Sequence, residues 1–264
     1  MTNVSSLTED VVIPRLTPRT LGGLKVVPVE DRPNFLNVLI YGDPGVGKTL
    51  LAGSAYEVEA MSPVLFIDIE GGTFSLRAKY PEVDVVRVQS WTDMQHVYDE
   101  LYRGQTGYKT IVLDSLTEIQ KFSMSDIMRD LVRREPDRDP DIPGMREWGK
   151  NIQQLRALVR AFRDLPCNAI FTALAAEEKN PRTGLIHSKP SLSGKLSAEV
   201  AGFVDIVLFM YTKRVEDQMV RLLLTAKTDT TIAKDRSGKL PAVVEVPTMA
   251  TIHQYIFNEE TNQE

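Results

Sequence analysis

The sequence predicts an α/β fold, with a mostly parallel central sheet flanked by helices and an antiparallel hairpin near the C-terminal end. Short apolar runs rich in Val, Ile and Leu alternate with longer segments of helical period. This alternation is typical of parallel strands covered on both faces. Two further apolar runs, 204–214 and 218–227, are separated only by a short polar link around Asp217, which favours an antiparallel hairpin.

The expected elements follow in order along the chain. Strands are predicted at 36–41, 64–69, 84–89, 109–114, 167–174 and 242–246, and helices at 47–60, 92–103, 115–132, 145–164 and near 249–257. The first 33 residues are proline-rich and predict an extended arm, with a short strand in "LKVVPVE". The predicted organisation is therefore an arm at 1–33, one core at 34–258 and a tail at 259–264. Polar stretches at 135–143 and 177–191 are expected to be the longest loops of the core.

Composition and charge limit the classes of function that are compatible with the sequence. The 264 residues are 42% hydrophobic and 25% charged, which is typical of a globular protein. A net charge of −5 argues against general affinity for nucleic acid, so such contacts need a local basic patch. The single cysteine, Cys167, excludes an intramolecular disulfide and is expected to be buried in a strand. There is no 18-residue apolar run and no signal peptide, so we expect a cytoplasmic protein without a membrane partner.

The segment "GDPGVGKT" matches the phosphate-loop pattern G-x-x-x-x-G-K-[ST]. An apolar strand precedes it and a helical segment follows, which is the context in which backbone N–H groups and a helix N-terminus can cradle phosphate. The alternative is a glycine-rich turn without a ligand. Lys48 is expected to reach the β and γ phosphates, and the Thr49 hydroxyl to ligate Mg²⁺. The predicted ATP-binding residues are Gly42, Asp43, Pro44, Gly45, Val46, Gly47, Lys48, Thr49 and Leu50.

A magnesium carboxylate is expected at the end of another strand. The apolar run in "YKTIVLDS" leads to Asp114, which would hold Mg²⁺ through water. The alternative is a cap for the next helix, for which Ser115 is equally suited. Because position 115 is Ser and not the Glu of many P-loop ATPases, the carboxylate that activates water must lie elsewhere.

The strand "VLFIDIEGG" supplies such a carboxylate. Side chains alternate along a strand, so Asp68 and Glu70 are predicted to share a face, with Glu70 at the carboxyl end where ligands bind in α/β sheets. Glu70 is therefore the predicted general base for the attacking water. The alternative is a cap for a helix starting near Thr73.

With the phosphate loop, "FIDIEGG" and "IVLDS" resemble the RecA family of recombination ATPases in order and approximate spacing. The resemblance implies a RecA-like P-loop NTPase core that binds ATP and Mg²⁺ between subunits, and it extends more weakly to residue 240. The chain has no room for the extra C-terminal domain of full-length RecA. It is most similar to the short, core-only phage proteins that act as single-strand annealing recombinases.

Two features depart from this family. The strand that leads into the second DNA loop ends "FTALAA" without the usual Gln, so Thr172 is the only polar candidate for sensing the γ phosphate. The N-terminal arm also lacks an obvious helix-plus-aromatic polymerisation motif.

By the same resemblance, the loops around 135–144 and 177–194 stand in the place of the two DNA-binding loops. The second contains the predicted DNA contacts, with a solvated loop as the alternative: Lys179, Arg182, Lys189 and Lys195. The first mixes Arg133, Arg134 and Arg138 with many acids, which favours DNA less. Trp148 follows this loop in a helical pattern with Ile152 and Leu155, and we expect it to pack in the core and not on a base.

Lys234 and Arg236 flank Asp235 after the predicted hairpin. The resemblance implies that they enter the ATP site of a neighbouring subunit and, with Glu70 and Lys48, complete the catalytic set. Lys227 is the alternative candidate for this role. The other interpretation of the segment is a basic turn exposed to water.

The predicted function is an ATPase, stimulated by DNA, that binds single-stranded DNA and promotes annealing or homologous recombination. Predicted partners are single-stranded DNA, further copies of the chain in a ring or filament, and a single-strand-binding protein. The alternatives are a nucleotide-gated assembly or loader ATPase in DNA replication or repair, and a helicase motor resembling the DnaB group. A small-molecule kinase is the least favoured.

Overall fold

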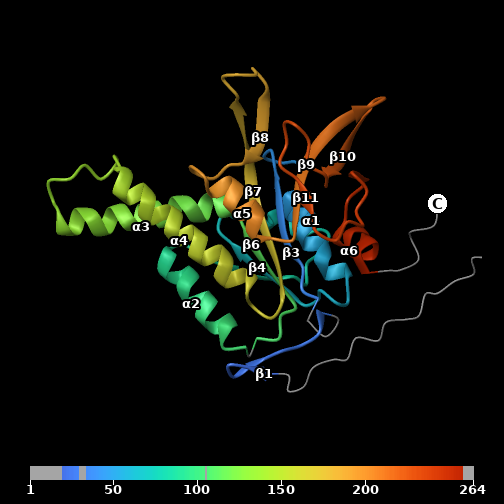
Figure 1. The fold of residues 1–264 in the computed structure, drawn as a ribbon, viewed down its shortest axis with the longest axis horizontal. Helices are drawn as coiled ribbons and strands as arrows, with labels where there is room; N and C mark the ends of the chain where they lie inside the picture. Colours follow the sequence, from blue (N-terminus) through green and yellow to red (C-terminus); the bar gives the residue numbers. More distant parts are fainter. Residues whose placement is uncertain (1–19, 30–33, 105, 258–264) are drawn as a thin grey trace, which may run out of the picture. The chain divides into compact units, whose positions relative to one another are not determined.

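The computed structural model describes residues 20–29, 34–104 and 106–257 (Figure 1). The chain divides into two compact units, Met1–Asn34 and Phe35–Glu264, which are described separately. In the first unit, β1 (Thr20–Leu21) and β2 (Leu24–Lys25) form a small exposed antiparallel pair. A strand thus begins where "LKVVPVE" begins, but it includes only two residues. The predicted C-terminal tail at 259–264 lies outside the described residues.

The second unit is built on one large sheet with the order β12-β10-β9-β3-β7-β6-β4-β5. The six strands from β9 to β5 are parallel, whereas β10 runs antiparallel to both β9 and β12. This arrangement confirms the predicted fold class, including the antiparallel hairpin. The strands are β3 (Asn37–Gly42), β4 (Val64–Asp68), β5 (Asp84–Arg87), β6 (Thr110–Asp114), β7 (Asn168–Lys179), β9 (Ile206–Val215), β10 (Gln218–Leu224) and β12 (Val243–Glu245).

Helices cover both faces of the sheet. The helices are α1 (Lys48–Gly53), α2 (Trp91–Tyr102), α3 (Leu116–Arg134), α4 (Met145–Arg163), α5 (Leu196–Phe203) and α6 (Met249–Phe257), with short 3-10 turns η2 (Ser54–Glu57) and η3 (Gly72–Leu76). Helices α2 to α5 bury one face of the sheet, and α1 and α6 bury the other. Successive residues of one strand therefore enter different cores, as Leu39 and Ile40 of β3 do.

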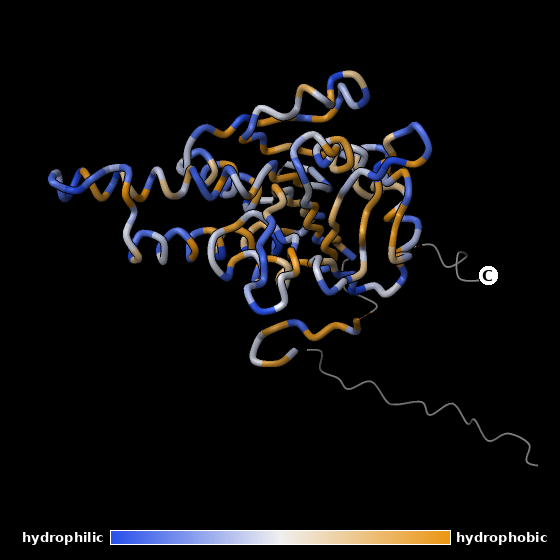
Figure 2. Tube along the Cα trace, turned by 90° about the horizontal axis from the view of Figure 1, so that it is seen from above, coloured by the Kyte–Doolittle hydropathy of each residue, from blue (hydrophilic) through white to orange (hydrophobic). Residues whose placement is uncertain are grey.

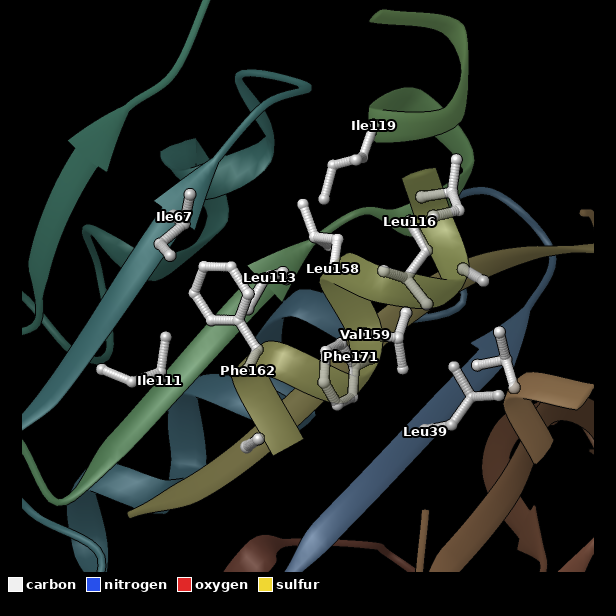
Figure 3. Packing of buried hydrophobic residues seen from close by; sticks show 14 of the residues in the cluster. Leu39, Ile67, Ile111, Leu113, Leu116, Ile119, Leu158, Val159, Phe162 and Phe171 are labelled. Carbon is white, nitrogen blue, oxygen red and sulfur yellow. The ribbon is translucent and has the colours of Figure 1, made fainter. Parts of the chain in front are cut away.

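Figure 3 shows part of the first of these cores. Phe162 and Val159 of α4 are fully buried against strand residues such as Ile111 and Phe171. Cys167, just before β7, is buried as expected, and burial raises the pKa of its thiol to about 11. This core holds α3 and α4 on one face of the sheet.

The segment 177–191 is not the loop that the sequence predicted. Strand β7 continues to Lys179 and pairs antiparallel with β8 (Ile186–Pro190), from Ala175 opposite Pro190 to Lys179 opposite Ile186. The turn forms because the Asn180 side chain accepts backbone hydrogen bonds from Arg182 and Thr183, and Gly184 takes a positive φ of 71°. We call this two-stranded extension the β7–β8 ribbon.

Helices α3 and α4 form an antiparallel hairpin that extends away from the sheet (Figure 1). A polar seam joins the two helices where the Gln120 amide donates to Asn151 and Asn151 donates to Ser123. The loop around 135–144 lies at the hydrophilic far end of this hairpin (Figure 2). None of the described helices is long and apolar enough to cross a membrane.

Candidate nucleotide site

The predicted phosphate loop connects β3 to α1. Gly45 and Gly47 adopt positive φ values of 75° and 111°, the left-handed conformations that let the loop curl before α1 begins at Lys48. The Lys48 ammonium folds back over the loop and donates to the Gly42 carbonyl at 2.9 Å and the Asp43 carbonyl at 2.8 Å. Burial lowers the Lys48 pKa, and three nearby acids, Asp114 foremost, oppose that shift. A phosphate group would add negative charge beside the same ammonium.

Thr49 and Asp114 meet as predicted for a magnesium pair. The Thr49 hydroxyl donates to Asp114 Oδ2 at 2.7 Å, and the Thr172 hydroxyl donates to Oδ1 of the same carboxylate. Asp114 is almost fully buried, which raises its pKa, while the Thr172 and Thr49 hydrogen bonds lower it. Oxygen donors converging at the end of α1 and β6 are the ligands that Mg²⁺ prefers, so these residues fit the ion. Asp114 therefore does not cap the next helix.

Thr172 acts on this pair from the neighbouring strand. Its side chain is fully buried and its hydroxyl is engaged by Asp114. The structure thus shows that Thr172 holds the Asp114 carboxylate.

Glu70 lies in the loop after β4, because that strand ends at Asp68. Asp68 is buried and accepts hydrogen bonds from Gly71 N at 2.8 Å and Thr73 Oγ1 at 3.0 Å. Asp68 therefore holds the turn into η3, a role that the sequence offered as the alternative for Glu70. The Glu70 carboxylate is exposed and accepts a hydrogen bond from the Ser115 hydroxyl.

The loop after Glu70 approaches Thr49 and Asp114 closely. A Cβ added to Gly72 would lie 3.8 Å from both Asp114 Oδ2 and Thr49 Oγ1. Glu70 also lies close enough to Lys48 to raise the pKa of that ammonium. The arrangement places an exposed carboxylate beside the expected position of the terminal phosphate, which is what a water-activating base requires.

A cavity of about 500 Å³ adjoins the phosphate loop. Residues from the loop, from the β9–β10 hairpin and from the segment before α6 line it, among them Gly47, Thr212, Arg221 and Thr248. A Cβ on Gly47 would lie 3.1 Å from Arg221 Nε, so this guanidinium belongs to the site of its own chain. The sequence did not single out Arg221, because only the pairing of β9 with β10 brings it to the loop.

Lys234 and Arg236 lie away from their own phosphate loop. They are on or beside β11 (Lys234–Asp235), which pairs with the amino end of β9, whereas the phosphate loop is at the carboxyl end of β3. Lys234 Nζ donates to the Ala201 carbonyl at 2.8 Å and the Val204 carbonyl at 2.5 Å, at the C-terminal end of α5. Arg236 pairs with Asp205 at 2.8 Å. Both residues therefore have intrachain roles, and a catalytic role requires a second copy.

The predicted DNA contacts are divided between two places. A cleft of about 650 Å³ lies between the β7–β8 ribbon and the segment around Lys227; it is lined by Lys179, Arg182, His187, Lys189 and Lys227, together with the acids Glu178 and Asp229. We call it the ribbon cleft. Lys189 is paired with Glu178 there. Lys195 does not line this cleft but stands at the start of α5. Lys227 is likewise not at the phosphate loop.

The arginines near the loop around 135–144 lie beside acids. Arg133 and Arg134 lie 3.5 Å and 4.0 Å from Asp130, and Arg138 lies 3.5 Å from Glu147. The hairpin end is thus a mixed-charge surface, which favours phosphate binding less than the ribbon cleft does.

A protein-family model described as an AAA domain, AAA_24, matches residues 34–237, well over half of the chain. Among solved structures, the chain is similar to the crystal structure of a KaiC-like protein from the hyperthermophilic archaeon Pyrococcus horikoshii OT3. That similarity has 16% identity and a TM-score of 0.43, over 72% of this chain and 77% of the other. No curated protein matches the chain significantly.

Proposed function

We propose that this chain, which belongs to the AAA domain family AAA_24 of P-loop ATPases, couples ATP hydrolysis to the binding of single-stranded DNA. The coupled activity would serve annealing or strand exchange. The family match supports ATP binding and hydrolysis. The binding of single-stranded DNA is what this proposal adds.

At the nucleotide, each residue has a distinct task. Lys48 and the loop amides would hold the phosphates, and Thr49 with Asp114 would hold Mg²⁺. When bound, Mg²⁺ would neutralise charge on the phosphate oxygens. Glu70 would accept a proton from the attacking water, while Ser115 fixes the orientation of its carboxylate.

One observation supports DNA as the coupled ligand: strand β7 runs from the magnesium carboxylate to the ribbon cleft. Thr172 of β7 bonds Asp114, and two residues later Leu174 N donates to Thr117 at 3.0 Å. The same strand then continues to Lys179 at the basic end of the ribbon. A rigid strand shared by both sites provides a physical route by which phosphate chemistry and ligand binding can influence each other.

The first test compares ATPase rates with and without single-stranded DNA, and measures particle size in parallel. The expected result is stimulation together with assembly beyond a monomer. If DNA neither stimulates hydrolysis nor binds when a non-hydrolysable ATP analogue is present, the loader alternative is favoured. Unwinding of a forked duplex would favour the helicase alternative instead.

The ribbon charges give a sharper prediction. The double variant Lys179→Ala/Arg182→Ala should weaken binding to oligothymidylate. It should also make the slope of the logarithm of the binding constant against the logarithm of the salt concentration shallower by about 1.4, because each single-strand phosphate contact contributes about 0.7. Fluorescence anisotropy at a series of salt concentrations measures this slope.

The matched control for the ribbon variant is Arg133→Ala/Arg134→Ala, which removes the same charge from the end of α3. These arginines do not line the ribbon cleft, so the slope should be unchanged. Equal effects of the two double variants would show that only net charge matters and that the ribbon is not the DNA contact.

The proposed trans role of Arg236 predicts complementation between inactive variants. Arg236→Ala keeps Glu70 but lacks the arginine that would enter the neighbouring ATP site. Glu70→Gln keeps that arginine but lacks the general base. Each should be inactive alone, and a mixture should recover part of the ATPase activity if the site is completed by a neighbour.

The control for intrachain damage is Asp205→Asn, which removes the carboxylate that pairs with Arg236 and leaves the arginine in place. Its ATPase activity should stay close to that of the wild type. Mixtures as inactive as their components would refute the trans role.

A further inference from the structure

A second cleft, of about 460 Å³, lies where α3 and α4 meet the base of the β7–β8 ribbon. We call it the tryptophan cleft; its lining residues are Thr117, Gln120, Lys121, Met124, Trp148, Ala176, Ser191, Leu192 and Ser193. No acidic residue is among them, although acids outnumber bases in the chain. The lining thus combines an aromatic ring and apolar groups with one cation.

Trp148 does not occupy the core position that the sequence predicted. Leu155 of the same helix is buried at 1% exposure and Ile152 packs against the core, but Trp148 is 40% exposed. A large aromatic ring left half in solvent forgoes much of the free energy that burial would provide. Because the ring lies at a cleft wall, its exposed face can stack on a ligand in the cleft.

Lysines border the tryptophan cleft. Lys121 is part of the lining, and its ammonium pairs with Glu118 one turn earlier on α3. Lys189, which pairs with Glu178, stands directly opposite Ala176 in the ribbon register, so the side chains of Lys189 and Ala176 point to the same face. Lys195 follows two residues after Ser193. An aromatic face bordered by cations is the combination that holds single-stranded nucleic acid, with a base on the ring and phosphates on the cations.

The walls of the cleft are also tied to the nucleotide site. Thr117 donates to the Ser191 carbonyl at 3.3 Å and accepts from Leu174 N, and Gln120 accepts from Ser193 N at 3.0 Å. Thr117 is two residues after Ser115, the hydrogen-bond partner of Glu70. A ligand in the cleft would therefore contact the helix that begins at the catalytic edge.

We propose that the tryptophan cleft binds a nucleobase of single-stranded DNA by stacking on Trp148, with Lys121 at the adjoining phosphate. This inference rests on the proposed function and adds a base-binding site to it. The border lysines can exchange their carboxylate partners for phosphate, and with the polar groups of the lining they favour a nucleic acid over an apolar peptide segment.

The chain offers its own optical test because it has two tryptophans, Trp91 and Trp148. Trp91 is on α2 and lines a different cleft, beside Phe162. In Trp91→Phe, the emission of Trp148 alone should be quenched by oligothymidylate in the presence of an ATP analogue. In Trp148→Phe, which retains Trp91, the quenching should be lost.

Affinity gives an independent measurement. Trp148→Ala should lower the affinity for oligothymidylate by about 5- to 150-fold, the range that corresponds to the loss of one base–aromatic stack. Trp148→Phe should keep most of the affinity because a smaller ring still stacks. An oligonucleotide of abasic sites, which keeps the phosphates, should not quench Trp148, and thermal unfolding of each variant checks that the fold is intact.

Two failures are distinguishable. If Trp91→Phe binds oligothymidylate at full strength but the emission of Trp148 is unchanged, or abasic DNA quenches it equally, the stacking site is wrong and the proposed function stands. If neither the wild type nor any variant binds single-stranded DNA, the proposed function fails and this inference fails with it.

Discussion

Replacing Glu70 with Gln is expected to lower the turnover number for ATP by about 10²–10⁴-fold, the contribution typical of a positioned general base. The amide is nearly isosteric and can still interact with the Ser115 hydroxyl, but it cannot accept the proton of the attacking water. Because Glu70 is exposed and Gln keeps its size, the free energy of unfolding should change little. Binding of a fluorescent ATP analogue should therefore persist while phosphate release is lost.

The matched control is Glu59→Gln, the same chemical change at an exposed glutamate before β4, at the opposite edge of the sheet. It should leave turnover unchanged. Ser115→Ala is a graded test, since it removes the hydrogen bond that orients the base but keeps the carboxylate, and a smaller loss is expected. Wild-type hydrolysis in Glu70→Gln would place the base elsewhere.

The parts of the site that the sequence predicted are those formed by short contiguous patterns. The phosphate loop, Asp114 and the strands that support them need only local glycine spacing and an apolar run. The Thr49–Asp114 contact followed as well, because the carboxyl ends of parallel strands meet at one edge of a sheet.

The features that were missed depend on pairing between distant segments. Arg221 reaches the phosphate loop only through the register of β10 on β9, and no local pattern marks it. The ribbon was predicted as a loop because Pro181 and Gly184 dominate its turn, while its two strands are polar and lack the apolar alternation of a half-buried strand. Trp148 matched a helical core period, but the position of its helix turns that residue toward a cleft.

Gly42→Ala is expected to cause the largest loss of stability among single substitutions in the phosphate loop. Gly42 is opposite Met210 in the parallel pairing of β3 with β9, and a Cβ there would lie 2.2 Å from the Met210 carbonyl oxygen. That oxygen is main chain, so no side-chain rotation can relieve the overlap. We expect a loss of about 3 kcal/mol in the free energy of unfolding, the upper end of the usual cost of overpacking, measurable by urea denaturation. Weaker nucleotide binding should accompany it, because the Gly42 carbonyl is a contact of Lys48.

Gly45→Ala provides the comparison within the same motif. Gly45 has a positive φ of 75° but open space around it, so alanine there meets only the backbone cost of the left-handed conformation, about 1–2 kcal/mol. The motif requires only one of these two glycines, yet the structure assigns each a different physical reason: close approach of β9 at Gly42 and backbone conformation at Gly45. If the two alanine variants unfold at the same urea concentration, the tight β3–β9 contact is not what position 42 requires. If Gly42→Ala is clearly the less stable, the first glycine of the motif serves the packing of the sheet as well as the phosphate.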